Sequence, residues 1–72
     1  MITLDCYSFL TEERRITIYL DSSIIYMMTG PFFNAEKVQV RHLCISESDI
    51  PFEILDTFDN YDKVIKILEG RG

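Results

Sequence analysis

The chain has 72 residues, 47% of them hydrophobic, with 12 acidic side chains against 7 basic ones. This composition excludes a disordered chain and predicts a single domain over residues 1–72. The net charge of -5 opposes direct binding to nucleic acid, which relies on cations that neutralise phosphates, and it opposes docking on anionic membranes. The sequence contains no apolar run of about 18 residues and no signal peptide, so we expect a cytoplasmic protein.

Two segments with alternating side chains open the chain and predict a β-hairpin, Ile2–Leu10 and Arg15–Asp21. A three-residue loop, Thr11–Glu13, would set Leu10 opposite Arg14 and bring the aliphatic side chains of both strands onto one face. A four-residue loop would mix aliphatic and aromatic side chains on both faces, so we predict the odd loop. The outer face of the hairpin would then carry three aromatic residues: Tyr7, Phe9 and Tyr19.

Two further strands are expected before residue 46. Ile24–Thr29 is apolar on both sides, which is typical of a central strand, and Gly30-Pro31 should end it. Lys37–Ile45 alternates with a change of parity near Arg41, which predicts a bulge there or cover on both faces. Together these segments predict a four-stranded antiparallel sheet.

The stretch Ile50–Leu68 is predicted to form a C-terminal helix. Its apolar residues recur at steps of three and four and would form one stripe: Ile50, Ile54, Phe58, Tyr61, Ile65 and Leu68. One bent helix and two short helices, the second capped by Asp59, remain as alternatives. The expected fold is therefore α+β, with a ββββ sheet and one C-terminal helix, possibly bent or split, packed on one face. The expected core joins Ile54, Phe58, Ile65 and Leu68 to Leu4, Cys6, Ile16 and Ile18.

Few residues fit catalysis or metal binding. Cys6 and Cys44 are expected to be free structural thiols, although a disulfide between them is conceivable. His42 and Cys44 share one side of a predicted strand, but a tetrahedral metal site would need two more ligands from elsewhere. We therefore expect no cofactor and no metal, and a chain that is not an enzyme.

An acidic segment provides the first candidate binding surface. Six acids fall between residues 46 and 62 with no Lys or Arg before Lys63: Glu47, Asp49, Glu53, Asp56, Asp59 and Asp62. On a helix Asp49, Glu53 and Asp56 would line up, where like charges repel by a few tenths of a kcal/mol. The functional interpretation is an anionic surface for a basic partner protein. The alternative is that acids favour a helix N-terminus without any further role.

The aromatic set Tyr7, Phe9 and Tyr19 provides the second candidate surface. One helix covers only one face of a small sheet, and Tyr and Phe on the open face are residue types enriched at interfaces. The alternative is ordinary cross-strand pairing on a solvated face. The sequence does not decide between the acidic and the aromatic surface.

These features predict a small acidic protein-binding module, an inhibitor or adaptor that acts on a basic, nucleic-acid-handling protein. Phage-encoded blockers of CRISPR effectors are one such class, by analogy of size and charge alone. The alternative is a self-associating structural protein, a homodimer joined through the open sheet face or through the edge of the fourth strand. A small metal-binding or catalytic protein is the third hypothesis. Salt should dissociate a charge-driven partner but not an apolar dimer.

Overall fold

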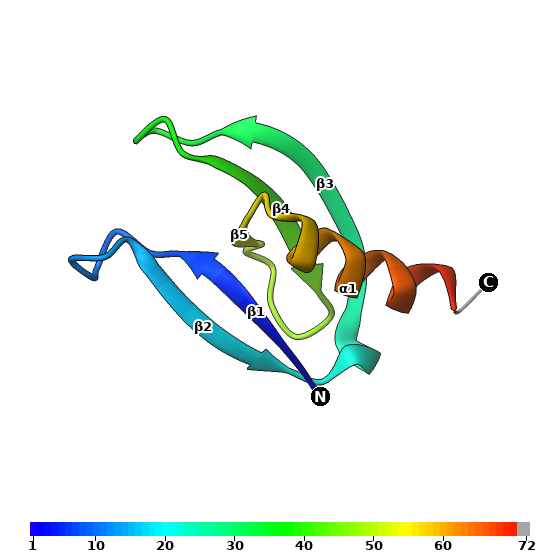
Figure 1. Cartoon of the computed structure of the whole chain (residues 1–72). Helices are drawn as coiled ribbons and strands as arrows, with labels where there is room; N and C mark the ends of the chain where they lie inside the picture. The colour runs from blue at the N-terminus through cyan, green and yellow to red at the C-terminus, as the bar shows by residue number, and fades with distance from the viewer. Residues whose placement is uncertain (71–72) are drawn as a thin grey trace.

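The computed structural model describes residues 1–70, which form one antiparallel sheet and one α-helix (Figure 1). The elements are β1 (Ile2–Tyr7), β2 (Arg15–Leu20), the 3₁₀ helix η1 (Ser22–Ile24), β3 (Ile25–Phe33), β4 (Gln39–Ile45), β5 (Phe52–Leu55) and α1 (Phe58–Glu69). The sheet order is β2-β1-β5-β4-β3. The predicted α+β class with a C-terminal helix is confirmed, but the sheet of the described chain has five strands instead of four. No helix among the described residues is long and apolar enough to cross a membrane.

The fifth strand comes from the first half of the predicted helix, so the prediction of a helix over Ile50–Leu68 is wrong there. β5 pairs with β4 along its length and meets β1 at Cys6↔Ile54, which leaves Ile54 completely buried. Between two strands, the buried backbone of this segment finds hydrogen-bond partners along β4 and, near Cys6, in β1. The helix begins at Phe58 instead, and its N-cap is Thr57, whose hydroxyl accepts from the Asn60 N–H at 3.1 Å. Asp59 is therefore not a cap.

The shorter helix turns a different face to the sheet than the apolar steps predict. Its buried residues are Asn60 and Val64, while Phe58 is 83% exposed and Ile50, in the preceding loop, is 77% exposed. The core consists of Leu4, Cys6, Ile25, Leu43, Ile45, Ile54 and Val64, with Ile18 and Leu68 packed at its border. The predicted burial of Phe58 is wrong, and Ile16, at 39% exposed, is only partly covered. The helix contacts β1 and β3 and leaves β2 largely outside its cover.

The first hairpin has the predicted face assignment but a longer turn. β1 and β2 pair without interruption from Ile2↔Leu20 to Tyr7↔Arg15, so the turn spans residues 8–14. This register differs by an even number of residues from the predicted one, and the aliphatic side chains of both strands still share one face. Arg14, with a φ of 58°, lies in the turn, and its Nη1 donates to two turn carbonyls at 2.6 and 3.2 Å.

β3 and β4 exchange the positions that the sequence predicts for them. β4 is an interior strand, paired with both β3 and β5, whereas β3 lies at the outer edge. β3 also continues through the cis Gly30-Pro31 bond to Phe33, with a register shift between Thr29 and Phe32, opposite Arg41. Gly30 has a φ of 110°, and a Cβ there would lie 3.2 Å from the Arg41 Cα. An edge position accommodates the proline because no outer neighbour needs its missing N–H.

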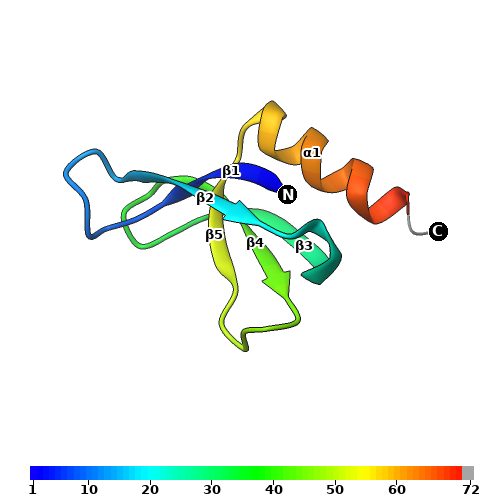
Figure 2. The same cartoon turned by 90° about the horizontal axis from the view of Figure 1, so that it is seen from below.

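Helix α1 lies on one face of the sheet (Figure 2). Two of its side chains complete the inner edge of β1, where β5 pairs only at Cys6. The Asp5 N–H donates to Asn60 Oδ1 at 3.2 Å, and Asn60 Nδ2 donates to the carbonyls of Asp5 and Leu55, both at 2.8 Å. Lys63 Nζ donates to the Thr3 carbonyl at 2.9 Å. Two helix side chains thus provide the hydrogen bonds that a neighbouring strand would otherwise make.

Candidate binding surfaces

The turns of the β1–β2 and β3–β4 hairpins project from the same end of the molecule, away from α1 (Figure 1). An ion pair joins the two turns, with Arg14 Nε 3.2 Å from Glu36 Oε2. Beside it lies a surface hollow of about 250 Å³, which we call the hairpin hollow. Its lining residues are Tyr7, Phe9, Asn34, Ala35, Glu36 and Glu53. The hollow therefore combines two aromatic rings with two carboxylates.

The Asn34 side chain makes hydrogen bonds both within the β3–β4 turn and to Glu53 on β5. Its Oδ1 accepts from the backbone N–H groups of Glu36 and Val38, both at 3.0 Å, which closes the β3–β4 turn. Its Nδ2 donates to Glu53 Oε1, also at 3.0 Å, so the same side chain holds a carboxylate from β5 in the hollow. Lys37 follows with a φ of 64°, the left-handed conformation that tightens the turn. One asparagine thus couples the turn to the position of Glu53.

Tyr7 contributes the second notable polar group of the hollow. The hydroxyl oxygen of this half-buried side chain is shielded from solvent and makes no hydrogen bond of normal length and angle within the described residues, although the Glu36 carboxylate is close enough to act on it. Burial raises the pKa of Tyr7, and the nearby Glu36 carboxylate raises it further. The phenol therefore stays protonated at neutral pH, and its oxygen can accept a hydrogen bond from a donor group that enters the hollow. Phe9, 66% exposed, lies at the rim.

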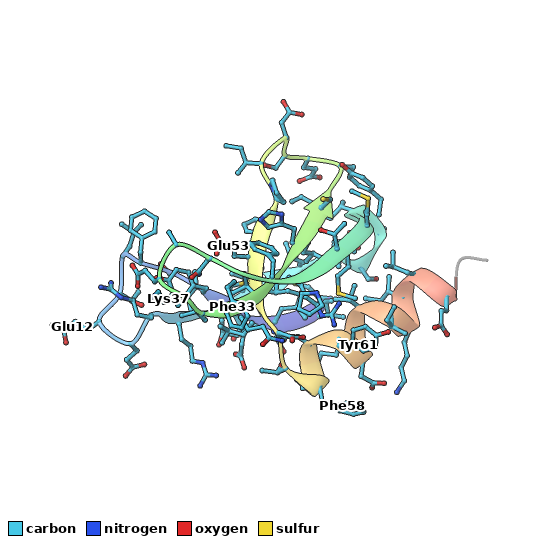
Figure 3. The ribbon with its side chains drawn as sticks, turned by 90° about the horizontal axis from the view of Figure 1, so that it is seen from above. Glu12, Phe33, Lys37, Glu53, Phe58 and Tyr61 are labelled. Atoms are coloured by element: carbon cyan, nitrogen blue, oxygen red, sulfur yellow. The ribbon has the colours of Figure 1, made fainter. Side chains whose placement is uncertain are left out.

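The six acids of the candidate surface do not lie on one helix, because half of the predicted helix is a strand and its flanking loops. Glu47 and Asp49 are exposed in the β4–β5 loop, Glu53 is on β5, Asp56 follows β5, and Asp59 and Asp62 are on α1. Figure 3 shows Glu53 well away from the helix residues Phe58 and Tyr61. The predicted alignment of Asp49, Glu53 and Asp56 on one helical face is therefore wrong.

Three of these acids are matched by cations within the chain. Asp56 accepts from Arg41 Nε at 2.9 Å, and Asp59 and Asp62 pair with the next basic residues along the helix, Lys63 at 3.1 Å and Lys66 at 3.0 Å. The hydrogen bond from Arg41 holds the pKa of Asp56 below its ordinary value. These pairs leave less uncompensated negative charge on α1 than the acidic segment suggests.

A second hollow, of about 330 Å³, lies at the N-terminal end of α1, lined by Arg41, Asp56, Thr57, Phe58 and Tyr61. The Arg41 guanidinium carbon is 4.8 Å from the centre of the Tyr61 ring. Arg41 also donates to the Gly30 carbonyl at 3.3 Å, in addition to its ion pair with Asp56. The cation and the anion of this hollow are therefore already paired with groups of the same chain.

The remaining predicted residues lie outside both hollows. Tyr19 is on the sheet face away from the helix, as is Tyr7, but it is 69% exposed and does not line the hairpin hollow. The His42 ring packs edge-to-face on Phe32, with centroids 4.4 Å apart. Cys6 and Cys44 are free thiols, and burial raises the pKa of Cys6 to about 12. Within residues 1–70, no group of three His, Cys, Asp or Glu side chains is placed to hold a metal ion.

The structure thus brings together one residue of the acidic set, Glu53, and two of the aromatic set, Tyr7 and Phe9. Sequence reasoning missed Asn34 and Glu36, although an Asn at the start of a polar turn is a recognisable signal. Comparisons of the chain with protein-family models, curated proteins and solved structures give no match. The contacts described above are therefore the basis for a functional proposal.

Proposed function

We propose that this chain is a non-enzymatic protein-binding module whose hairpin hollow receives an Arg or Lys side chain of a basic partner protein. The observation that carries the proposal is the lining of the hollow, where the rings of Tyr7 and Phe9 lie next to the carboxylates of Glu36 and Glu53. Aromatic faces attract cations, and carboxylates form charge-assisted hydrogen bonds with them. This combination favours a cationic group over a neutral or anionic one.

The charges around the hollow support the same ligand class. Glu36 shares its carboxylate with Arg14, and both side chains are about half exposed, at 43% and 50%. Glu53 accepts a hydrogen bond from the Asn34 amide, which is neutral, so its negative charge has no ion-pair partner among the described residues. A guanidinium or ammonium group in the hollow would compensate this charge.

The net charge of -5 supports a partner with a basic surface, because long-range attraction raises the rate of encounter. Proteins that handle nucleic acid commonly carry such surfaces. We therefore propose that the chain acts as an inhibitor or adaptor that occupies the basic surface of a nucleic-acid-handling protein. In this account the hollow fixes one anchoring side chain, and the wider negative charge speeds association.

The ligand class can be tested by titrating the isotope-labelled protein with N-acetyl-arginine amide and N-acetyl-lysine amide while amide NMR signals are recorded. The matched control is N-acetyl-citrulline amide, which has nearly the shape of the arginine compound but no charge. We expect saturable shifts centred on Tyr7, Phe9 and Ala35 with the cationic compounds and none with the citrulline compound. Equal shifts with citrulline, or shifts centred elsewhere, would contradict the proposal.

A pair of double variants then separates the hollow from the general acidity of the chain. Glu36→Gln with Glu53→Gln removes both carboxylates of the hollow, and Glu47→Gln with Asp49→Asn removes the same charge from the exposed β4–β5 loop. We expect the first variant to lose about tenfold or more in affinity for the arginine compound, roughly the effect of one charge-assisted contact. The second should lose much less. An equal loss in both would assign binding to diffuse charge instead of the hollow.

A further inference from the structure

The two outer edges of the sheet are built differently. β3 has two register shifts and contains Pro31, features that make an edge a poor template for another strand. β2 has neither: it pairs with β1 through six consecutive residues without a shift, and its other side has no neighbouring strand within the described chain. Only β2 therefore presents a regular edge.

Two residues of β2 direct their backbone N–H and C=O groups outward from this edge. The Ser8 N–H donates to the Arg14 carbonyl, and backbone bonds in an antiparallel pair alternate along the strand. Ile16, Ile18 and Leu20 therefore bond to β1, whereas the N–H and C=O groups of Thr17 and Tyr19 face outward. Arg15 also faces outward, but its N–H and C=O are already bonded to the Thr11 hydroxyl at 3.2 and 3.5 Å.

We propose that two copies of this chain pair antiparallel through β2, about a two-fold axis at Ile18. In this register Thr17 lies opposite Tyr19 of the second copy, so the outward-facing backbone groups meet. Each such pair exchanges two N–H···O bonds, and symmetry generates the pair twice. The result is one continuous sheet across both copies with a helix from each copy on the same face. This inference is independent of the hairpin hollow, which contains no residue of β2.

The side chains of β2 favour this register over those shifted by one residue. Ile18 would lie opposite Ile18 of the second copy, and Ile16 would lie opposite Leu20 of the second copy. This pairing joins the aliphatic rows of the two β2 strands, which α1 leaves partly uncovered. A register shifted by one residue would instead set these aliphatic rows against Thr and Tyr.

Charge complementarity supports the same alignment. The register sets Arg15 opposite Asp21 of the second copy, and does so twice. Arg15 has no ion pair within residues 1–70, and the Asp21 carboxylate accepts from Ser23, whose N–H lies at 3.0 Å, but forms no ion pair within the same residues. Both side chains are exposed and can turn toward a neighbouring strand.

Sedimentation velocity over a dilution series tests the dimer. We expect the unmodified chain and Thr17→Ala to sediment as dimers and Thr17→Pro to sediment as a monomer, because proline removes an outward N–H that only the second copy uses. Circular dichroism checks that the proline variant is folded. A monomeric unmodified chain, or a folded Thr17→Pro that remains a dimer, would overturn the proposal.

Disulfide trapping tests the register and does not depend on the proline variant. Ile18→Cys should form a covalent dimer on mild oxidation, since a residue on the two-fold axis lies opposite the same residue of the second copy, at a distance that a disulfide can bridge. Both cysteine variants are made in a chain that also carries Cys44→Ser, so that Cys44 cannot react. The remaining native thiol, Cys6, is buried. Thr29→Cys on the β3 edge is the matched control and should remain monomeric. Equal trapping of both variants, or trapping of Thr29→Cys alone, would overturn the assignment to β2.

Discussion

The polar groups of β1 that face α1 and those near the hairpin turns are satisfied to different degrees. Toward the helix, the backbone of Asp5 is satisfied in both directions by the Asn60 side chain, which is only 1% exposed. Toward the hairpin turns, the Tyr7 hydroxyl is shielded from solvent and makes no hydrogen bond of normal length and angle among the described residues. A buried polar group with all its bonds made stabilises a fold, whereas one without a partner costs free energy until a ligand supplies one. This difference assigns stability to the helix end and binding to the end with the turns.

The largest effect is expected from Asn60→Leu. The change leaves the Asp5 N–H and the carbonyls of Asp5 and Leu55 without their partners, which should lower the free energy of unfolding by about 3 kcal/mol or more. Urea denaturation measures it. Asn60→Asp is the control, because it keeps an acceptor for the Asp5 N–H but loses both donated bonds. A loss below about 1 kcal/mol in Asn60→Leu would show that the helix end does not depend on this bridge.

A smaller, pH-dependent effect is expected from Asp56→Asn, which replaces a charge-assisted bond to Arg41 with a neutral one, at a cost of about 1 kcal/mol at neutral pH. Since the folded-state pKa of Asp56 is lowered, its contribution is present above the unfolded pKa of about 3.9 and disappears as the pH falls through the folded value. The stabilities of the two proteins should therefore converge in acid when urea melts are repeated at decreasing pH.

Asp59→Asn serves as the control for this measurement. Its ion pair with Lys63 is far more exposed, with the Asp59 side chain at 72%, and should be worth less than about 0.5 kcal/mol. If Asp59→Asn costs as much as Asp56→Asn, the partial burial of the Arg41–Asp56 pair is not the source of its strength.

The smallest effect on stability is expected from Tyr7→Phe. Removing a shielded hydroxyl that makes no hydrogen bond of normal length and angle should leave the free energy of unfolding unchanged or raise it by up to about 1 kcal/mol. A thermal melt measures it, and the arginine titration described above should show weaker binding. A loss of more than about 1 kcal/mol would mean that the hydroxyl makes a bond in the free protein, and the contrast with Asn60 would disappear.

Local patterns in the sequence predict the elements whose partners are close in the chain. The alternation in Ile2–Leu10 and Arg15–Asp21 places the correct faces together, because register parity follows from burying one face. The second half of the predicted helix is also confirmed, from Phe58 onward. Its first half fails because isolated apolar residues at steps of four are compatible with a short strand followed by a turn, and only the pairing with β4 and β1 decides between them.

The candidate site was less accessible to sequence reasoning. The hairpin hollow exists because three segments meet, the end of β1, the β3–β4 turn and β5, and no local pattern encodes that meeting. Asn60 was missed for the same reason: within a helix it reads as an exposed polar residue, and only its position beside the unpaired edge of β1 explains its burial. Lys63 and Lys66, which pair with the acids on α1, follow directly in the sequence. Arg41, which pairs with Asp56, comes from another strand and is not visible in the local pattern.

The Asn60 bridge also has a consequence for the order in which the chain folds. It joins residues 55 positions apart, and the Lys63 bond to Thr3 spans 60. β1 is synthesised before α1, and its inner edge remains without these partners until α1, the last of the described elements, is available. The first hairpin therefore has an open strand edge until the later elements have been made, and such an edge can pair with another nascent chain. Closure of the fold depends on a late, long-range event, and such events slow folding.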